Sequence, residues 1–219
     1  MNAAYEFVTG PLAWAAWGIF LLGSAWRLFS MYQLAKRKDA PYLTYMSWHF
    51  SLRSIVNWLI PFNALGWKAN PAMTVATFVF HICLVVTPIF LVAHVMLWDQ
   101  YFGISFPTIA DNVADIMTLV VIGVCLFFAG RRITQPEVRY ITTSQDWVAL
   151  IIVLAPFLTG FLAYHQMLNY DLMIILHVVA GEVMLAAIPF TRLSHMVFAV
   201  FTRAYMGSEF GGVRHARDW

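Results

Sequence analysis

The chain has 219 residues, of which 61% are hydrophobic and only 11% are charged. Ordinary soluble domains carry about 25% charged residues, so this composition excludes a soluble globular protein and favours an integral membrane protein. At this length there is room for one small bundle, and we expect a single membrane domain over residues 1–219. We expect no nucleic-acid partner.

Five apolar runs are long enough to cross a hydrocarbon core of about 30 Å. They cover residues 11–32, 72–98, 113–130, 147–166 and 171–201. The predicted fold is therefore an all-α, integral membrane five-helix bundle. The N-terminal segment before the first run has no basic region and no small-residue cleavage site, so we expect no cleaved signal peptide.

The connection between the first two runs contains HFSLRSIVNWLIPF, residues 49–62. Aromatic and aliphatic residues alternate there with polar ones, which predicts an amphipathic helix lying in the membrane interface. We expect His49 to be an ordinary interfacial residue. Cys83 and Cys125 lie within apolar runs, far from any paired-thiol spacing, and are predicted to be packing residues.

The basic residues predict the orientation, because Lys and Arg favour cytoplasmic loops. All 13 belong to the first connection and its approach, the third connection, or the end of the last run and the tail. The N-terminus and residues 99–112 and 167–170 have none. This places the N-terminus outside and the C-terminus in the cytoplasm. The glycine-rich tail GSEFGGVRHARDW is either a solvated extension or a segment that docks on a cytoplasmic partner, and we expect His215 to be solvated.

The fifth run carries His177 near one end and His195 near the other, eighteen residues apart. On a straight helix this is five turns, so both imidazoles leave one face, separated by roughly 27 Å along the axis. Neutral histidine is a good ligand for haem iron, and a polar side chain inside a membrane is a functional hypothesis by default. A straight fifth helix is thus predicted to hold one ligand for each of two haems.

The second run carries the matching residues, His81 and His94. With the predicted orientation, His94 and His177 share the outer half of the membrane, and His81 and His195 share the inner half. Thirteen residues leave His81 and His94 roughly 220° apart on an ideal helix. We therefore predict that the second helix bends near Thr87 and Pro88. The competing interpretation of any single histidine is a hydrogen-bonded packing residue.

Several segments resemble a known family. FHICLVVTPIFLVAHVMLWDQYFGIS and LHVVAGEVMLAAIPFTRLSHM are similar to the cytochrome b (gamma) subunit of respiratory nitrate reductases. The similarity is closer to the membrane subunits of the Dsr, Tmc and Hmc transmembrane redox complexes of sulfate reducers, which FVTGPLAW, GISFPTIADNVADIMTL, PEVRYITTSQDW and PFLTGFLAYH also resemble. The resemblance covers nearly the whole chain. Nitrate reductase subunits have a shorter spacing in the second helix, which argues against nitrate reduction as the partner reaction.

This resemblance implies two haem b groups, with His81 and His195 on the inner haem and His94 and His177 on the outer one. It implies electron exchange with a quinone, and menaquinone is the expected one. It also implies a cytoplasmic iron-sulfur subunit of heterodisulfide-reductase type, a periplasmic multihaem cytochrome c, or both, in a prokaryotic cytoplasmic membrane.

Quinol oxidation needs a cleft beside a haem and a group that accepts protons. We predict His165 and Asp115 as the quinone and proton site near the outer haem; the alternatives are an ordinary interfacial histidine and an aspartate without a functional role. Further candidates, each with an alternative role as an interfacial or capping residue, are Tyr164, Asp111, Trp98 and Tyr101.

Two charged side chains near the haem ligands leave their roles open. Glu182 either relays protons or bonds to a neighbouring helix. Arg192 either pairs with a propionate of the inner haem or extends to the cytoplasmic interface.

The sequence thus predicts a dihaem cytochrome b subunit that transfers electrons between a quinone near the outer face and partner subunits. Ferric-reductase-like and hydrogenase-linked cytochromes b remain alternatives, although no flavin or nicotinamide domain is visible. A haem-free membrane anchor of a redox complex is the alternative from a different class.

Overall fold

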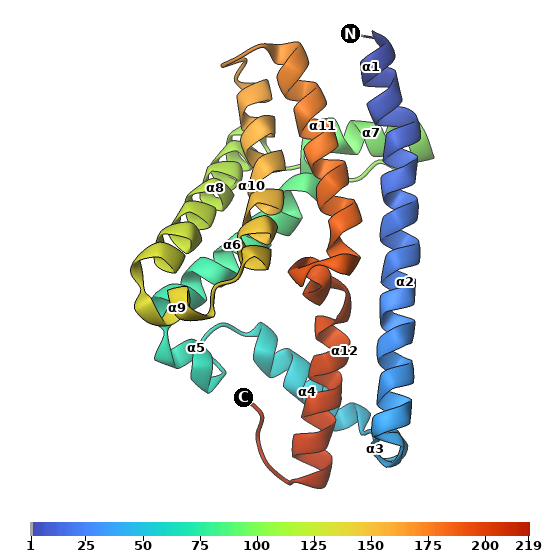
Figure 1. The fold of residues 1–219 in the computed structure, drawn as a ribbon, viewed down its shortest axis with the longest axis vertical. Coiled ribbons are helices and arrows are strands. Elements are labelled where there is room, and N and C mark those ends of the chain that lie inside the picture. The colour runs from blue at the N-terminus through green and yellow to red at the C-terminus, as the bar shows by residue number, and fades with distance from the viewer. Residues whose placement is uncertain (1) are drawn as a thin grey trace. The chain divides into compact units, whose positions relative to one another are not determined.

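The computed structural model describes residues 2–219, and within them it contains helices and no strand (Figure 1). Five helices are long and apolar enough to cross a membrane. They are Ala3–Lys38, Pro71–Phe90, Asp111–Thr134, Ser144–Tyr164 and Tyr170–Phe190. The predicted all-α class with five spans is confirmed, and the protein is a multi-pass membrane protein. Contacts divide the chain into two compact units, the first comprising residues 1–13 and 76–184 and the second residues 14–75 and 185–219.

The first span begins as α1 (Asn2–Phe7), passes through a π-helical turn η1 (Val8–Leu12) and continues as α2 (Ala13–Lys38). Pro11 lies inside the π turn. Proline lacks the amide hydrogen that would bond one turn back, so a local widening of the helix there has a clear cause.

The connection between the first two spans folds into α3 (Ala40–Thr44), α4 (Trp48–Leu59) and α5 (Leu65–Ala69). The predicted amphipathic helix is confirmed as α4. Its large apolar side chains form an exposed stripe, and small serines occupy a buried face. The stripe consists of Trp48, Leu52, Val56 and Leu59. An exposed apolar stripe is what an interfacial helix presents to lipid.

The buried face of α4 packs against α12 (His195–Ser208) in the second unit. Ser51 donates its hydroxyl hydrogen bond to the carbonyl of Ala204 at 2.8 Å. A Cβ added at Gly207 would lie only 2.2 Å from Cβ of Ser54. Because small residues let two backbones approach closely, this pair of helices is tightly joined.

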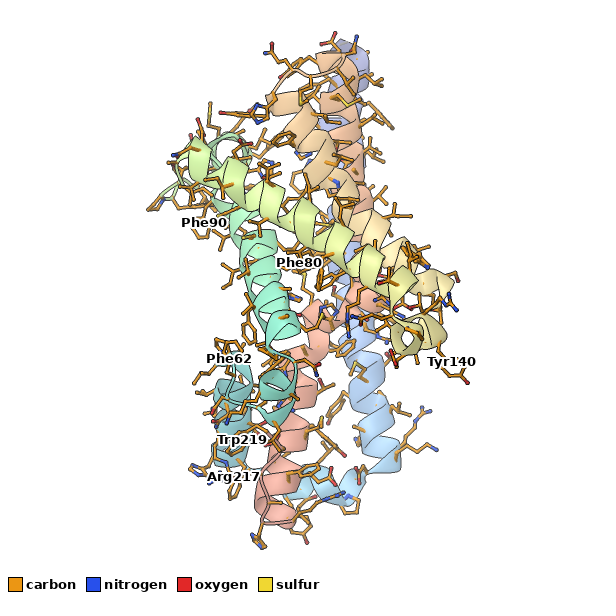
Figure 2. The ribbon with its side chains drawn as sticks, turned by 90° about the vertical axis from the view of Figure 1, so that its left-hand side faces the viewer. Phe62, Phe80, Phe90, Tyr140, Arg217 and Trp219 are labelled. Carbon is orange, nitrogen blue, oxygen red and sulfur yellow. The ribbon has the colours of Figure 1, made fainter. Side chains whose placement is uncertain are left out.

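The C-terminal tail follows α12 through a π-helical turn η4 (Glu209–Val213) and returns to the α4 and α12 pair. Arg203 pairs with the buried carboxylate of Asp218 at 2.8 Å, and Ser54 donates to the same carboxylate at 2.5 Å. Arg217 and Trp219 lie together at the end of the tail (Figure 2). The tail is thus partly packed on its own unit, while His215 is exposed as expected.

The second span is interrupted, as predicted. Helix α6 (Pro71–Phe90) ends, Leu91 adopts an extended conformation with φ −65° and ψ 132°, and α7 (Val92–Phe102) follows. The break lies three residues after Pro88. Phe80, labelled in Figure 2, packs edge-on against Phe128 of α8 with ring centroids 5.6 Å apart, which holds α6 within the first unit.

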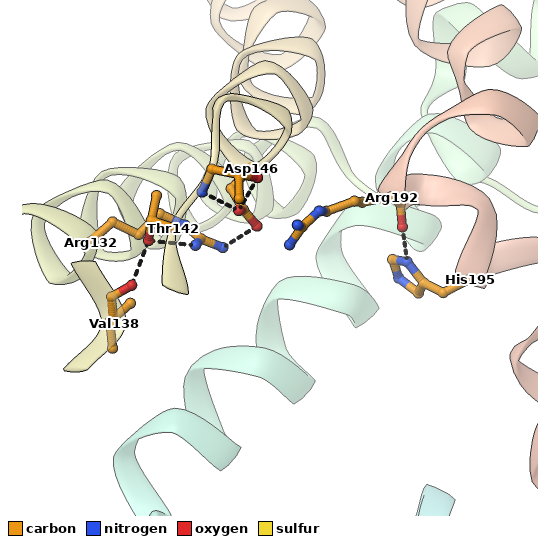
Figure 3. Close-up of polar contacts among 7 residues, drawn as sticks. Arg132, Val138, Thr142, Asp146, Arg192 and His195 are labelled. Carbon is orange, nitrogen blue, oxygen red and sulfur yellow. Dashed lines mark hydrogen bonds and ion pairs between the residues drawn. The ribbon is translucent and has the colours of Figure 1, made fainter. Parts of the chain in front are cut away.

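The third and fourth spans are α8 (Asp111–Thr134) and α10 (Ser144–Tyr164), joined through α9 (Pro136–Ile141). Arg132 bonds to Thr142 at 3.2 Å and to the buried carboxylate of Asp146 at 3.4 Å (Figure 3). Asp146 also forms a capping box with Thr143. The capping box satisfies amides that a helix N-terminus leaves unbonded, and the ion pair with Arg132 holds the Asp146 carboxylate, so the start of α10 is fixed.

The fifth run is not one straight helix, so the prediction of a five-turn common face is wrong. Helix α11 (Tyr170–Ala187) gives way to the 3₁₀ turns η2 (Ile188–Phe190) and η3 (Arg192–Ser194) before α12 begins at His195. Pro189 lies in the first turn of η2, and Thr191 is extended with φ −114° and ψ −173°. The Thr191 hydroxyl bonds to both Ala187 and Leu193, which stabilises the interruption.

Candidate functional site

Two of the four predicted haem ligands meet inside the first unit. The ring centroids of His94, on α7, and His177, on α11, are 5.9 Å apart, and the ring planes differ by 14°. Both side chains are partly buried. The structure therefore brings together the outer pair that the sequence predicts.

The break at Leu91 positions His94. An extended residue there interrupts the helical hydrogen-bond ladder, and the carbonyl of Pro88 accepts a hydrogen bond from Nδ1 of His94 at 2.8 Å. A carbonyl only accepts, so Nδ1 carries the hydrogen and the neutral ring has its lone pair on Nε2. The Pro88 interruption thus both turns the helix and orients the imidazole.

His177 is positioned by a different helix. Its Nδ1 donates to the carbonyl of Pro156, on α10, at 2.8 Å. A Cβ added at Gly160 would lie 2.8 Å from both Cε1 and Nδ1 of the same ring. The absence of a side chain at Gly160 therefore makes room for the imidazole, and the lone pair of His177 is again on Nε2.

This arrangement fits a bis-histidine haem. Haem b is a flat macrocycle whose iron takes one axial nitrogen on each face. With metal to nitrogen bonds of about 2.0 Å, two such rings have centroids roughly 6 Å apart. Each ligand histidine in metal sites usually donates its other ring nitrogen to a carbonyl or carboxylate, as His94 and His177 do. The residues present therefore match the group that the resemblance implies.

The other two predicted ligands lie in different compact units, His81 in the first and His195 in the second. Nδ1 of His81 donates to the Thr77 carbonyl at 2.7 Å, one helical turn earlier. Nδ1 of His195 donates to the Arg192 carbonyl, also at 2.7 Å (Figure 3). All four predicted ligands therefore share one tautomer, with the lone pair on Nε2. The pairing of His81 with His195 stays a prediction.

Arg192 contacts the His195 ring through its backbone. It begins η3, and its backbone carbonyl accepts the hydrogen bond from Nδ1 of His195. A backbone bond of this kind fixes the rotamer of His195 at the start of α12. The predicted contact of the guanidinium with a propionate stays a prediction.

His165 and Asp115, predicted as the quinone and proton site, form a hydrogen-bonded pair. Nε2 of His165, which follows the last residue of α10, lies 2.8 Å from a carboxylate oxygen of Asp115 on α8. Their side chains are 35% and 29% exposed, so the pair is reachable from outside the bundle. We refer to it below as the His165–Asp115 pair. Its histidine uses the opposite ring nitrogen from the four predicted ligands, which leaves Nδ1 to accept a proton.

The remaining quinone-site candidates have more ordinary surroundings. The Tyr164 ring packs edge-on against His165 with centroids 5.1 Å apart. Tyr101 donates its hydroxyl hydrogen bond to the Thr9 carbonyl at 3.3 Å, and Trp98 packs against Phe102. Asp111 lies in the first turn of α8, where a carboxylate favours the positive end of the helix dipole.

Two buried polar side chains of the first unit have no hydrogen-bond partner among the described residues. They are Glu182, through both carboxylate oxygens, and Thr87, through its hydroxyl. Glu182 follows His177 by five residues on α11, and Thr87 directly precedes Pro88. The expectation that Glu182 bonds to a neighbouring helix finds no such bond among the described residues.

Sequence reasoning missed two residues that hold the outer pair, Pro156 and Gly160. Their spacing of four residues on a predicted helix is the signal that was available, since it places both on one helical face. Nothing in the sequence alone indicated that His177 lies against that face.

Comparisons with known proteins identify a relative over almost the full chain. A protein of Nitratidesulfovibrio vulgaris (strain Hildenborough), whose name is given only as "Protein", is 36% identical over 211 residues. The match covers 94% of this chain and 93% of the relative. The chain belongs to the family of that protein. No family model matches the chain, and no solved structure matches it.

Proposed function

We propose that this protein is the dihaem b membrane subunit of a respiratory redox complex in a prokaryotic cytoplasmic membrane. It transfers electrons between menaquinol or menaquinone near the outer face and partner subunits. The resemblance supports a cytoplasmic iron-sulfur subunit of heterodisulfide-reductase type, a periplasmic multihaem cytochrome c, or both, as those partners.

The observation that carries the proposal is the outer histidine pair. His94 and His177 come from different helices, their rings are nearly parallel, and their centroids are 5.9 Å apart. Each has its lone pair on Nε2 because a backbone carbonyl accepts from Nδ1. A haem b held by two histidines changes between ferric and ferrous states and so carries one electron at a time.

Two haems suit the membrane thickness. The hydrocarbon core is about 30 Å thick, and a single haem does not come close to both surfaces. His81 and His195, predicted to lie in the inner half, share the tautomer of the outer pair. We therefore propose them as the ligands of a second, inner haem, with Arg192 as a propionate partner.

The His165–Asp115 pair supplies the proton chemistry that a quinol requires. Oxidation of one quinol to quinone releases two electrons and two protons. Nδ1 of His165 accepts a proton, and the Asp115 carboxylate at 2.8 Å from Nε2 stabilises the resulting imidazolium. His165 lies five residues beyond Gly160, which contacts His177, so the pair is about 7.5 Å further along the α10 axis than the outer ligand.

The test uses membranes that contain the full chain, with a menaquinol analogue as reductant and b-type absorbance as the signal. We expect rapid reduction in the wild type. Asp115→Asn removes the charge that stabilises the imidazolium and is expected to slow reduction about 10²-fold, the scale of general base catalysis. Haem content is expected to stay unchanged.

Asp171→Asn is the matched control, because Asp171 is an exposed carboxylate in the first turn of α11, in the same unit. It is expected to reduce at the wild-type rate. Equal rates in Asp115→Asn and Asp171→Asn would contradict the proposed proton site. A chain that no quinol analogue reduces would contradict the proposed function itself.

A further inference from the structure

We propose that Pro156 and Gly160 of α10 form a socket that sets the ring plane of His177 and thereby tunes the outer haem. The inference rests on the proposed function. It assigns a positioning role to a helix that carries no haem ligand. The socket is defined as the Pro156 carbonyl and the bare Cα of Gly160.

Two contacts on one helical face hold the imidazole. The Pro156 carbonyl accepts from Nδ1 of His177 at 2.8 Å. Four residues later, a Cβ at Gly160 would meet Nδ1 and Cε1 at 2.8 Å and Nε2 at 3.5 Å. Residues four apart lie above one another on a helix, so the backbone of α10 contacts one side of the ring along its length.

Gly160 differs from other glycines of the first unit in the space that surrounds it. At Gly123 on α8, an added Cβ would have no atom of the described residues within 4 Å, so that glycine is not required by packing. A Cβ at 2.8 Å from a ring held by a hydrogen bond forces the ring to tilt or α10 to move. Either displacement changes the angle of 14° between the two imidazole planes.

The carbonyl contributes a second effect. A hydrogen bond from Nδ1 increases the electron donation of the ligand nitrogen, and such outer contacts tune haem potentials. Thr159 also donates its hydroxyl to the Pro156 carbonyl, at 3.3 Å, in addition to a bond of 2.7 Å to the Ala155 carbonyl. Removing this second side-chain donor leaves the Pro156 carbonyl to the His177 ring and the helical backbone amide of Gly160.

The experiment compares three variants of the full chain in membranes. The readouts are the midpoint potential of each haem and the electron paramagnetic resonance signal of the oxidised haems, which depends on the angle between the two axial imidazole planes. We expect Gly160→Ala to shift the resonance signal and the potential of one haem and to leave the other haem unchanged. Gly123→Ala, on α8 of the same unit, is expected to match the wild type in both readouts.

Thr159→Val keeps the α10 backbone and the side-chain shape, so it tests the socket even where Gly160→Ala fails to accumulate. It is expected to lower the potential of the same haem that Gly160→Ala perturbs. The socket is overturned if Thr159→Val has wild-type midpoint potentials and resonance signals, and if Gly160→Ala, wherever the protein is obtained, has them too. A wild-type chain without haem would instead overturn the proposed function.

Discussion

The two predicted ligand pairs differ in how the chain holds them. The outer pair lies within one compact unit, and each ring is anchored from outside its own helical turn. His94 bonds to a carbonyl six residues earlier across a helix break, and His177 bonds to another helix. The inner histidines are exposed, and Nδ1 of each donates to a carbonyl three or four residues earlier. They also belong to different units.

This difference implies two kinds of site. We expect the outer site to be preorganised, because the centroid separation and the tautomer of its rings are compatible with an iron between them. The inner rings have the same tautomer but are exposed, so we expect a bound haem to contribute more to their order. Variants that separate the two sites are the means of testing this contrast.

Loss of a ligand is expected to give the largest effect. His177→Ala should remove the outer haem and leave the inner one, halving the haem per chain, and His195→Ala should do the opposite. Haem quantitation with midpoint potentials distinguishes the haem that remains. His215→Ala, which changes an exposed tail residue, is the control and should retain both haems. Two haems in His177→Ala would contradict the pairing.

Heating the two single-haem variants tests the contrast in anchoring. The outer haem, alone in His195→Ala, is expected to be released at a higher temperature than the inner haem, alone in His177→Ala. The physical reason is that half-buried, externally bonded ligands lose more contacts on release than exposed ones. Loss of b-type absorbance during a thermal scan measures both. Release in the reverse order would refute a preorganised outer site.

Disturbing the packing of α4 against α12 is expected to destabilise the second unit, which contains both helices. Gly207→Ala places a Cβ 2.2 Å from Cβ of Ser54, and overpacking of this kind costs about 1–3 kcal/mol. Because His195 begins α12, the inner haem should shift in potential while the outer one does not. Gly66→Ala, where an added Cβ meets nothing within 4 Å, serves as control. Identical unfolding curves for the two variants would argue against the packing role.

A change in the interruption between α11 and α12 is expected to have the smallest effect on the free energy of unfolding. Thr191→Val removes the hydroxyl that accepts from the Leu193 amide at 3.2 Å, and loss of such a cap costs about 0.5–2 kcal/mol. Unfolding in detergent measures the change. In Thr202→Val the lost hydroxyl only bonds back within its own helix, so little change is expected. If Thr191→Val lowers the free energy of unfolding no more than Thr202→Val does, then Thr191 does not stabilise the interruption.

The five spans were predictable because length and apolar composition alone determine whether a helix crosses a bilayer. The interruption near Pro88 was predictable for a similar reason, since proline removes a backbone donor. Pro189 removes a donor in the same way and lies where α11 ends, so the fifth run is interrupted and not straight as its apolar length suggests. The consequence is that the spacing of His177 and His195 does not define a common face.

The titratable residues of the candidate site were predictable from the sequence, but the residues that position them were not. Histidines in apolar runs are conspicuous in a sequence, and the prediction of His165 and Asp115 as one site agrees with their hydrogen bond of 2.8 Å. Pro156 and Gly160 act through a carbonyl and an absent side chain, and neither has a signature in residue type. Such supports become visible only when two helices are placed against each other.

The number of haem groups per chain tests the central claim most directly. The full chain, purified from membranes in mild detergent, is assayed for haem b against protein concentration and by its reduced-minus-oxidised spectrum. Two haem b per chain, both reduced and reoxidised, is the predicted result. A folded chain with no b-type absorbance, or with a single haem, would contradict it.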